Sequence, residues 1–216
     1  MNRVRIGRLH VITDETVQCR YRHEELAAHA VAGGADVVQY REKRDLPFAV
    51  RLSTAQRIVA AAGAVRCVVN DHVDIASRAG AWGVHVGVHD VSPRQARQSW
   101  PAARCVGATA NDLARALRVV ACGADYVGVG PVFETTSKER PAPVLGLAGL
   151  ERIANAVDRP VIAIGGIDAR NVGSVLAAGA WGVAVLSAVV TDPDPRSATS
   201  RIRERIERGI ARGIAV

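Results

Sequence analysis

Short apolar runs alternate with longer helix-like segments along almost the whole chain. This alternation predicts strands that are each followed by a helix, the pattern of a parallel sheet covered by helices. The expected strands are 9–13, 37–41, 67–70, 82–86, 105–109, 126–130, 161–166 and 182–187. The expected helices are 24–33, 47–62, one ending at 79, one opening at Ser92-Pro93, one capped by Asn111 and running to 122, 147–157, one capped by Asp168, and 195–209.

Four Gly-Ala pairs mark the ends of alternate helices. Each pair follows an expected helix and leads into strand two, four, six or eight: Gly34-Ala35, Gly80-Ala81, Gly123-Ala124 and Gly179-Ala180. Glycine just beyond a helix favours the left-handed turn that ends it. Eight units with this recurrence predict a single (β/α)8 barrel, a TIM barrel, over residues 1–216. The alternative is a doubly wound open sheet, but strand one lacks the following GxGxxG motif.

The composition agrees with buried parallel strands. Hydrophobic residues make up 49% of the chain and aromatic residues only 4%, so the apolar content is mainly Val, Ala, Ile and Leu. The four cysteines are scattered without a C-x-x-C motif, which indicates reduced core thiols and a cytoplasmic protein. The N-terminus lacks the apolar run of a signal peptide, and no stretch is long enough for a membrane span.

The formal charge of +7 raises the question of nucleic-acid binding. The arginines are spread along the chain, however, and those of the last expected helix alternate with Glu204 and Glu207. That arrangement is typical of a solvated helix face. We therefore expect no nucleic-acid partner and no membrane partner. The oligomeric state stays open, a homo-oligomer included.

The end of the second expected strand carries Gln39, Arg41 and Lys43 two residues apart. On an extended chain, side chains at that spacing point the same way. An amide, a guanidinium and an ammonium on one face suit an anionic ligand. The chain has 28 basic residues, yet only Lys43 and Lys138 are lysines, which indicates positions that need a compact ammonium.

Polar residues also follow the next strands of the predicted barrel. Asn70-Asp71 ends strand three, Asp90 follows strand four and Thr109 ends strand five. In a barrel these strand ends meet at one face, where active sites lie. Two carboxylates at adjacent strand ends suit Mg²⁺, whose shell is completed by water and phosphate oxygens. Together with the cations they predict a diphosphate site.

A second group of residues predicts another phosphate site. Gly165-Gly166 follows strand seven and Ser187 ends strand eight, where barrels commonly bind phosphate on backbone N–H groups. The loop Thr135-Thr136-Ser137-Lys138 lies between the two groups. Two phosphate sites in one mouth suggest two phosphorylated small-molecule substrates joined with loss of diphosphate. His85 falls within a strand and is interpreted as structural, and no Ser or Cys is paired with a base.

Five motifs, taken in order, resemble those of thiamine-phosphate synthases. The resemblance covers about 9–195 and rests on residues 39–43, 70–71, 83–87 with Asp90, 123–133 and 164–167. It implies a TIM barrel transferase of thiamine biosynthesis that condenses an aminopyrimidine diphosphate with a thiazole phosphate, giving thiamine phosphate and diphosphate. It also implies a dissociative displacement that needs no protein nucleophile.

The same resemblance assigns roles to individual residues. Asp71 and Asp90 are implied to hold Mg²⁺. The pyrimidine diphosphate is implied to contact Gln39, Arg41, Lys43, Asn70, Thr109 and Lys138, of which Arg41, Thr109 and Lys138 assist catalysis. The thiazole phosphate is implied to contact Thr135, Ser137, Gly166, Leu186 and Ser187.

Several positions depart from the family pattern. Val88 stands where Gln is frequent, Thr109 replaces Ser, Ser137 replaces Thr, and Glu134 replaces Pro. Residues 133–135 and 92–95 resemble the sister family of thiazole tautomerases, but that family's catalytic His is replaced here by Pro131. The alternatives to a synthase are therefore a tautomerase or a non-catalytic thiazole-phosphate binder. A synthase requires magnesium and releases diphosphate, whereas a tautomerase does neither.

Overall fold

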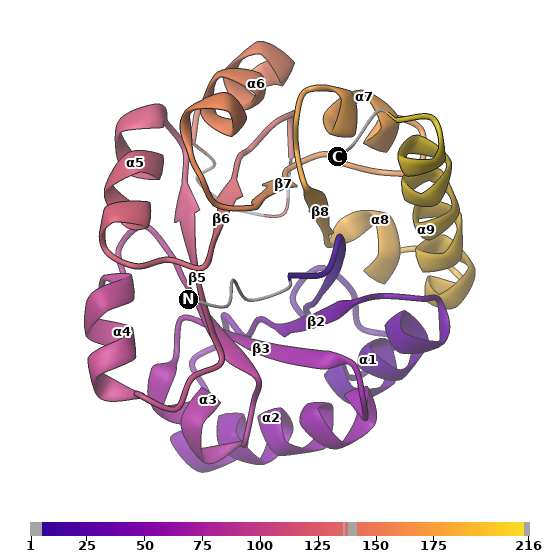
Figure 1. Cartoon of the computed structure of the whole chain (residues 1–216). Helices are drawn as coiled ribbons and strands as arrows, with labels where there is room; N and C mark the ends of the chain where they lie inside the picture. The colour runs from indigo at the N-terminus through magenta and orange to yellow at the C-terminus, as the bar shows by residue number, and fades with distance from the viewer. Residues whose placement is uncertain (1–5, 136, 138–141, 214–216) are drawn as a thin grey trace.

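The computed structural model describes residues 6–135, 137 and 142–213, and it confirms the closed barrel. Within these residues, strands β1 to β8 pair in parallel and in chain order, and β8 closes on β1 where Leu9 pairs with Val183. Figure 1 shows the ring of strands surrounded by helices. The strands are β1 Leu9–Thr13, β2 Val37–Tyr40, β3 Arg66–Asn70, β4 Gly83–Val86, β5 Cys105–Ala110, β6 Tyr126–Val129, β7 Val161–Ile164 and β8 Gly182–Val185.

Helices cover the outside of the ring, one after nearly every strand. They are α1 His23–Ala32, α2 Phe48–Ala62, α3 Val73–Arg78, α4 Pro93–Ser99, α5 Leu113–Ala121, α6 Gly146–Ala156, α7 Val172–Ala177, α8 Ser187–Val190 and α9 Pro195–Ala211. The last strand is followed by two helices, of which the short α8 was not expected. Its four residues carry no helix-period pattern that could be read from the sequence.

Alternating strand residues build two apolar layers. Outward side chains such as Val11, Val38 and Val84 are buried with the helices in the main core. Inward side chains form a smaller cluster inside the ring, composed of Ile6, Ile12, Cys105, Tyr126, Ile162 and Ala184. Each fully buried aliphatic side chain contributes about 1.5–3 kcal/mol. The polar mouth is therefore mounted on a rigid, close-packed ring.

The predicted Gly-Ala turns are confirmed by backbone geometry. Gly34, Gly80, Gly123 and Gly179 have φ angles of 91°, 68°, 90° and 85°. These angles lie in the left-handed region, which costs an L-residue with a side chain roughly 1–2 kcal/mol. The repeat therefore reports a backbone requirement of each helix-to-strand turn.

Two of the predicted helix caps were wrong. Asp112, and not Asn111, precedes α5 and accepts a hydrogen bond from the Arg115 backbone N–H at 2.7 Å. Asn171, and not Asp168, precedes α7. A second polar residue follows each predicted cap within three positions, and either member of such a pair can take the capping position. At α4 the expected cap is confirmed, since Ser92 and Gln95 form a reciprocal capping box.

Strand β7 is shorter than predicted and ends at Ile164. Gly165 and Gly166 have φ angles of 105° and 62°, which are incompatible with an extended strand. A Cβ on Gly166 would lie 2.5 Å from the Glu134 carbonyl oxygen. The glycine pair is thus required where the chain turns close against the loop that follows β6.

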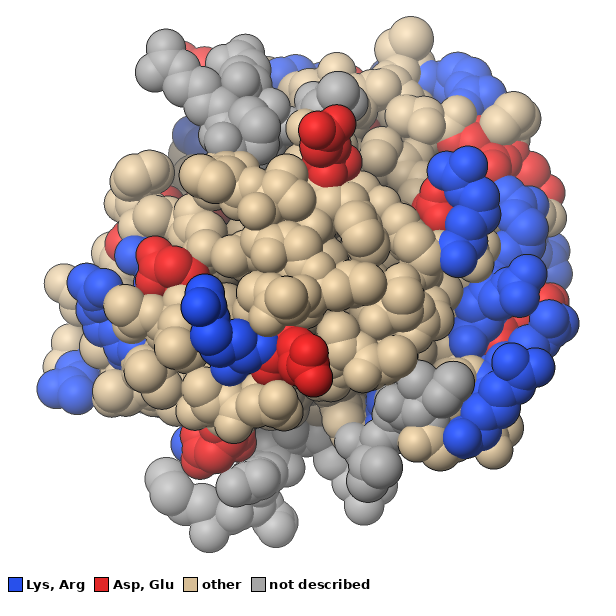
Figure 2. Space-filling view, turned by 90° about the horizontal axis from the view of Figure 1, so that it is seen from above, with Lys and Arg blue, Asp and Glu red and all other residues tan. Residues whose placement is uncertain are grey.

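The outer surface is unevenly charged. Figure 2 views the molecule from the side of α6 and α7, and much of that face is uncharged, whereas Lys and Arg gather at the edge where α9 lies. On α9, Arg208 pairs with Glu204 one turn earlier, as expected for a solvated helix face. Among the described residues, no helix is long and apolar enough to cross a membrane.

The inside of the barrel holds a buried histidine. His10 on β1 lies edge-on against Tyr126, with ring centroids 5.4 Å apart, and its Nε2 contacts the Gly7 carbonyl oxygen at 3.2 Å. Burial lowers the pKa of His10 from 6.5 to about 4. The ring is therefore neutral in the folded protein at neutral pH.

This burial predicts a loss of stability in mild acid. Below pH 6.5 the unfolded chain protonates His10, but the folded chain does so only near pH 4. The free energy of unfolding should therefore fall as the pH drops from about 6.5 to 4, by roughly 3 kcal/mol at most for this residue. Urea unfolding at pH 7 and pH 4.5 measures the fall, which should be smaller in His10→Gln. An equal fall in both proteins would contradict the assignment.

Candidate active site

The end of β2 divides its side chains between two sides, as the spacing predicted. Arg41 and Lys43 contact acidic residues at the ends of β1 and β3, namely Asp14 and Asp71. Tyr40 packs edge-on against His23 of α1, at the back of the strand. Gln39 is buried and alternates with Tyr40, so it lies on the same side of β2 as Arg41.

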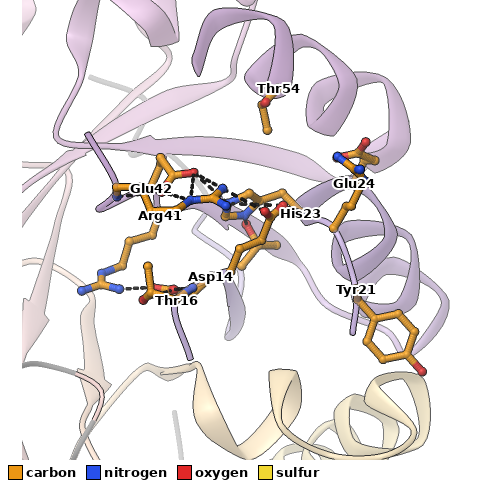
Figure 3. A network of polar contacts seen from close by, with 12 residues as sticks. Asp14, Thr16, Tyr21, His23, Glu24, Arg41, Glu42 and Thr54 are labelled. Atoms are coloured by element: carbon orange, nitrogen blue, oxygen red, sulfur yellow. Dashed lines mark hydrogen bonds and ion pairs between the residues drawn. The ribbon is translucent and has the colours of Figure 1, made fainter. Parts of the chain in front are cut away.

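Arg41 is held by a buried carboxylate. Its guanidinium donates to Asp14, the residue directly after β1, and Asp14 also accepts hydrogen bonds from the backbone N–H and the hydroxyl of Thr16 at 2.7 and 2.6 Å. Figure 3 shows this contact below the strand end. The side chains of Arg41 and Asp14 are 11% and 0% exposed. Burial lowers the pKa of Arg41, an effect opposed by the charge of Asp71.

A second polar network anchors the back of the same strand end. Glu42 accepts hydrogen bonds from the backbone N–H and the Nε of Arg44 at 2.8 and 2.9 Å, and it lies 3.5 Å from His23 Nε2. Arg44 also pairs with Glu15 at 2.8 Å. Burial opposes ionisation of Glu42, but the hydrogen bonds from Arg44 prevail and lower its pKa. As Figure 3 shows, Arg41 and Glu42 are thus fixed from opposite sides.

The structure brings the two predicted metal ligands together. Asp71 and Asp90 share a side-chain hydrogen bond, and the Lys43 ammonium donates to Asp71 Oδ2 at 2.5 Å. Burial and the neighbouring Asp71 raise the pKa of Asp90. Burial acts against ionisation of Asp71 as well, but Asp90 and Lys43 outweigh it and lower its pKa. Burial and mutual repulsion thus move the pKa values of the two carboxylates in opposite directions.

Backbone geometry presents these carboxylates to the mouth. Asp71 has a φ angle of 66°, and it has the only positive φ angle of a non-glycine residue in the described part of the chain. Its backbone N–H donates to the His85 carbonyl oxygen at 2.8 Å. Asp90 accepts from the Gly87 N–H at 2.6 Å, and a Cβ on Gly87 would lie 2.9 Å from the Asp90 carboxylate. Both acidic residues are thus held by neighbouring backbone.

This pair fits a hard divalent cation. Two adjacent carboxylates offer the oxygen donors and the negative charge that Mg²⁺ requires. Among the described residues, no third His, Cys, Asp or Glu joins them. Such a set leaves positions for water and for oxygens of a phosphorylated substrate. The position of Lys43 also supplies positive charge next to that substrate.

Thr109 lies on β5 and is partly exposed, and its neighbours Ala108 and Ala110 are buried. Its hydroxyl is 2.8 Å from His85 Nε2, and His85 Nδ1 is 2.9 Å from the Tyr126 hydroxyl. His85 lies in β4, as predicted. Asn70 is the last residue of β3 and is partly exposed. The predicted pyrimidine-diphosphate residues therefore span the ends of β2 to β5, but Lys138 lies outside the described residues.

The predicted thiazole-phosphate residues lie on the other half of the mouth. Thr135 and Ser137 belong to the loop after β6, where the Ser137 N–H donates to the Thr135 hydroxyl at 3.3 Å. That loop is joined to β7 by the hydrogen bond from the Phe133 N–H to the Gly165 carbonyl at 3.0 Å. Gly166 therefore borders the loop.

Gly166 and Ser187 also line one cleft. Arg170 and Arg201 contribute guanidinium groups to its wall, although each is paired with an aspartate, at 2.5 Å to Asp168 and 2.7 Å to Asp192. Leu186 precedes Ser187 at the start of α8 and is partly buried. The glycine and the serine predicted for one phosphate are thus neighbours.

The sequence did not lead us to predict two residues of this site. Asp14 holds Arg41, and it could have been chosen as a candidate because it is a polar residue directly after a strand. The Tyr126 hydroxyl gave no such signal, because Tyr126 opens its strand at the opposite end from the mouth. Its contact with His85 depends on the barrel register, which sequence spacing alone does not fix.

Known proteins resemble this chain over most of its length. A family described as thiamine monophosphate synthase matches residues 9–189. The thiamine-phosphate synthase of Methanoculleus marisnigri is 47% identical over 95% of this chain and 98% of its own length. That of Salinibacter ruber is 45% identical over 94% and 89%. The solved thiamine phosphate pyrophosphorylase of Pyrococcus furiosus superposes with a TM-score of 0.85 at 34% identity, covering 94% and 96% of the two chains.

The buried contact between Arg41 and Asp14 leads to a stability prediction. Asp14→Ala leaves a buried guanidinium without its partner and should lower the free energy of unfolding by about 3–5 kcal/mol. Urea denaturation measures this loss. The exposed pair of Glu204 and Arg208 provides the control, because Glu204→Ala should change stability by less than about 1 kcal/mol. Equal effects of the two variants would contradict the role given to Asp14.

Proposed function

The chain belongs to the thiamine monophosphate synthase family, and we propose that its barrel mouth joins an aminopyrimidine diphosphate to a thiazole phosphate. The products are thiamine phosphate and diphosphate, so the enzyme is a transferase. Full-length similarity to named synthases supports this reaction. The tautomerase alternative has no comparable support, because the position of its catalytic histidine is Pro131.

The contact of Lys43, Asp71 and Asp90 carries the proposal. A cation and two carboxylates meet at adjacent strand ends, next to the ordered guanidinium of Arg41. This arrangement suits a diphosphate bound together with a divalent cation. Gln39, Asn70 and Thr109 add neutral hydrogen-bonding groups on the same half of the mouth. We include Lys138 in this subsite on the resemblance of its loop.

The pyrimidine diphosphate reacts by loss of its leaving group. Electron donation from the aminopyrimidine makes the resulting cation accessible, and the thiazole nitrogen then captures it. No protein nucleophile is needed. Arg41, Lys43 and Lys138 stabilise the negative charge that grows on the departing diphosphate. Arg41 is suited to this task because Asp14 fixes it before substrate binds, which removes a reorganisation cost from the reaction.

Asp71 and Asp90 would hold Mg²⁺ in this site. When bound, the ion neutralises charge on the diphosphate and orients it. Lys43 lies beside this pair and would contact the oxygens of the diphosphate. The protein thus supplies the carboxylates, the preset guanidinium and the Lys43 ammonium.

The thiazole phosphate occupies the opposite half. Gly166 and Ser187 line one cleft, and Thr135 and Ser137 lie on the neighbouring loop. Small side chains and hydroxyls allow a phosphate to approach closely and to accept hydrogen bonds. Leu186 supplies an apolar contact at the start of α8. This placement leaves the thiazole nitrogen between the two phosphate sites.

We further propose that the enzyme acts in the cytoplasm on free metabolites. Cys19, Cys67, Cys105 and Cys122 are all free thiols in the structure, which suits a reducing compartment. The substrates are small phosphorylated molecules. We propose no nucleic-acid partner, because the basic residues of α9 alternate with acidic ones, as in the pair of Arg208 with Glu204.

The metal assignment predicts the behaviour of an isosteric variant. Asp71→Asn keeps the side-chain shape but removes one carboxylate, so magnesium-dependent diphosphate release should fall by about a hundredfold or more. A coupled diphosphate assay over a range of Mg²⁺ concentrations measures it. Asp74→Asn, three residues away at the exposed start of α3, should retain near-normal turnover. Full activity of Asp71→Asn at ordinary magnesium concentrations would contradict the metal site.

The thiazole-phosphate subsite is tested at Gly166. Gly166→Ala places a methyl group 2.5 Å from the Glu134 carbonyl oxygen at a φ angle of 62°, so the turn must move. The KM for thiazole phosphate should rise by about tenfold or more, a loss of ~1.4 kcal/mol in binding, while that for the pyrimidine diphosphate changes little. Gly123→Ala imposes similar strain at φ 90° without a close contact. If both variants change the thiazole phosphate KM equally, the subsite is misplaced.

A further inference from the structure

Three residues from adjacent strands form a hydrogen-bonded line through the barrel. Tyr126 opens β6, His85 lies in β4 and Thr109 lies near the end of β5. The Tyr126 hydroxyl is 2.9 Å from His85 Nδ1, and His85 Nε2 is 2.8 Å from the Thr109 hydroxyl. The line therefore runs from the closed interior of the barrel to a partly exposed hydroxyl in the mouth.

The barrel makes room for both rings through glycines. A Cβ on Gly107 would lie 2.1 Å from Tyr126 Cζ and 2.5 Å from its hydroxyl oxygen. A Cβ on Gly128 would lie 2.9 Å from His85 Cε1. The two rings stack at 30° with centroids 5.4 Å apart. Side chains at either glycine position would displace a ring, so the arrangement is built into the strands.

The buried Tyr126 hydroxyl determines which groups donate and which accept in these two hydrogen bonds. Tyr126 is 1% exposed, and burial raises the pKa of its hydroxyl well above the usual 10, so it carries its proton. Among the described residues, its hydroxyl contacts no acceptor other than His85 Nδ1. If Nδ1 carried a proton, the Tyr126 hydrogen would be buried without an acceptor, which costs about 1–3 kcal/mol. Tyr126 therefore donates to Nδ1.

The hydrogen bond at Nδ1 of His85 determines whether Nε2 donates or accepts. With Nδ1 accepting from Tyr126, the neutral ring carries its proton on Nε2 and donates to Thr109 Oγ. The threonine oxygen then acts as the acceptor in that contact. Its own hydrogen is left to point elsewhere, and Thr109 is the partly exposed member of the line.

We propose that Tyr126 and His85 are positioning residues that orient the Thr109 hydroxyl as a hydrogen-bond donor toward an acceptor atom of the pyrimidine diphosphate. This inference rests on the proposed function, because it concerns the residues that orient Thr109, one of the proposed contacts of the pyrimidine diphosphate. No proton is transferred along this line of hydrogen bonds. Its role is to fix the direction in which the Thr109 hydroxyl donates. Thr109 touches the substrate, whereas the other two residues act through it.

The histidine tautomer tests the proposal without any substrate. Long-range ¹H–¹⁵N correlation spectra of the ¹⁵N-labelled protein at neutral pH distinguish rings protonated on Nε2 from those protonated on Nδ1. The chain has six histidines, and the signals lost in His85→Gln identify those of His85. The proposal requires the Nε2–H tautomer. An Nδ1–H tautomer or a doubly protonated ring would overturn it, whatever the enzyme is found to catalyse.

A double-mutant cycle tests whether Tyr126 acts through Thr109. Tyr126→Phe removes one oxygen and keeps the ring that fills the space beside Gly107. It should lower kcat/KM for the pyrimidine diphosphate about tenfold, as for loss of one well-placed hydrogen bond, with the KM for thiazole phosphate unchanged. In Thr109→Val, which lacks the hydroxyl, the same change should cost less than about twofold.

Thr109→Ser provides the matched control for this cycle. It keeps the hydroxyl, so Tyr126→Phe should again cost about tenfold in that background. An equal cost in the Ser and Val backgrounds would show that Tyr126 only supports the fold and would overturn the proposal. The tautomer spectrum of Tyr126→Phe reports at the same time whether the ring environment of the other histidines is retained. If wild-type protein released no diphosphate, the function would fail while the tautomer measurement still decided this inference.

Discussion

The mouth of this barrel depends on the pairing of like and unlike charges at the ends of β1 to β4. Asp14 holds Arg41, Lys43 holds Asp71, and Asp71 is hydrogen-bonded to Asp90. An unpaired ion in such a partly desolvated place costs several kcal/mol, so each group needs its partner. The contact with Asp14 keeps the Arg41 guanidinium in position.

Close packing around glycines connects the fold with the site. Because Gly107 and Gly128 have no side chains, Tyr126 and His85 fit inside the ring. This packing places His85 next to Thr109. Because Gly165 and Gly166 also lack side chains, the chain after β7 can turn closely against the loop after β6. In each case a residue of the mouth is placed by a backbone approach that only glycine allows. The packing of the barrel and the positions of the mouth residues therefore depend on the same glycines.

The sequence predicted the barrel because its strand–helix alternation and Gly-Ala turns follow from local backbone physics. It also predicted that Asp71 and Asp90 meet, because ends of adjacent parallel strands must do so. It did not predict that Arg41 is already occupied by Asp14, nor the line from Tyr126 to Thr109. Those contacts depend on register and side-chain direction between strands of the barrel, which local sequence spacing does not fix. The wrong caps Asn111 and Asp168 have a local cause, since another polar residue that can cap the helix follows one position later at Asp112 and three positions later at Asn171.

The central claim is that the mouth joins two phosphorylated substrates with loss of diphosphate. The most direct measurement is mass-spectrometric quantification of thiamine phosphate and diphosphate made by the purified protein, with either substrate or Mg²⁺ omitted in turn. The account predicts equal amounts of both products in the complete mixture and none in any omission. Product formation that is indifferent to magnesium, or isomerisation of the thiazole phosphate without diphosphate release, would contradict it.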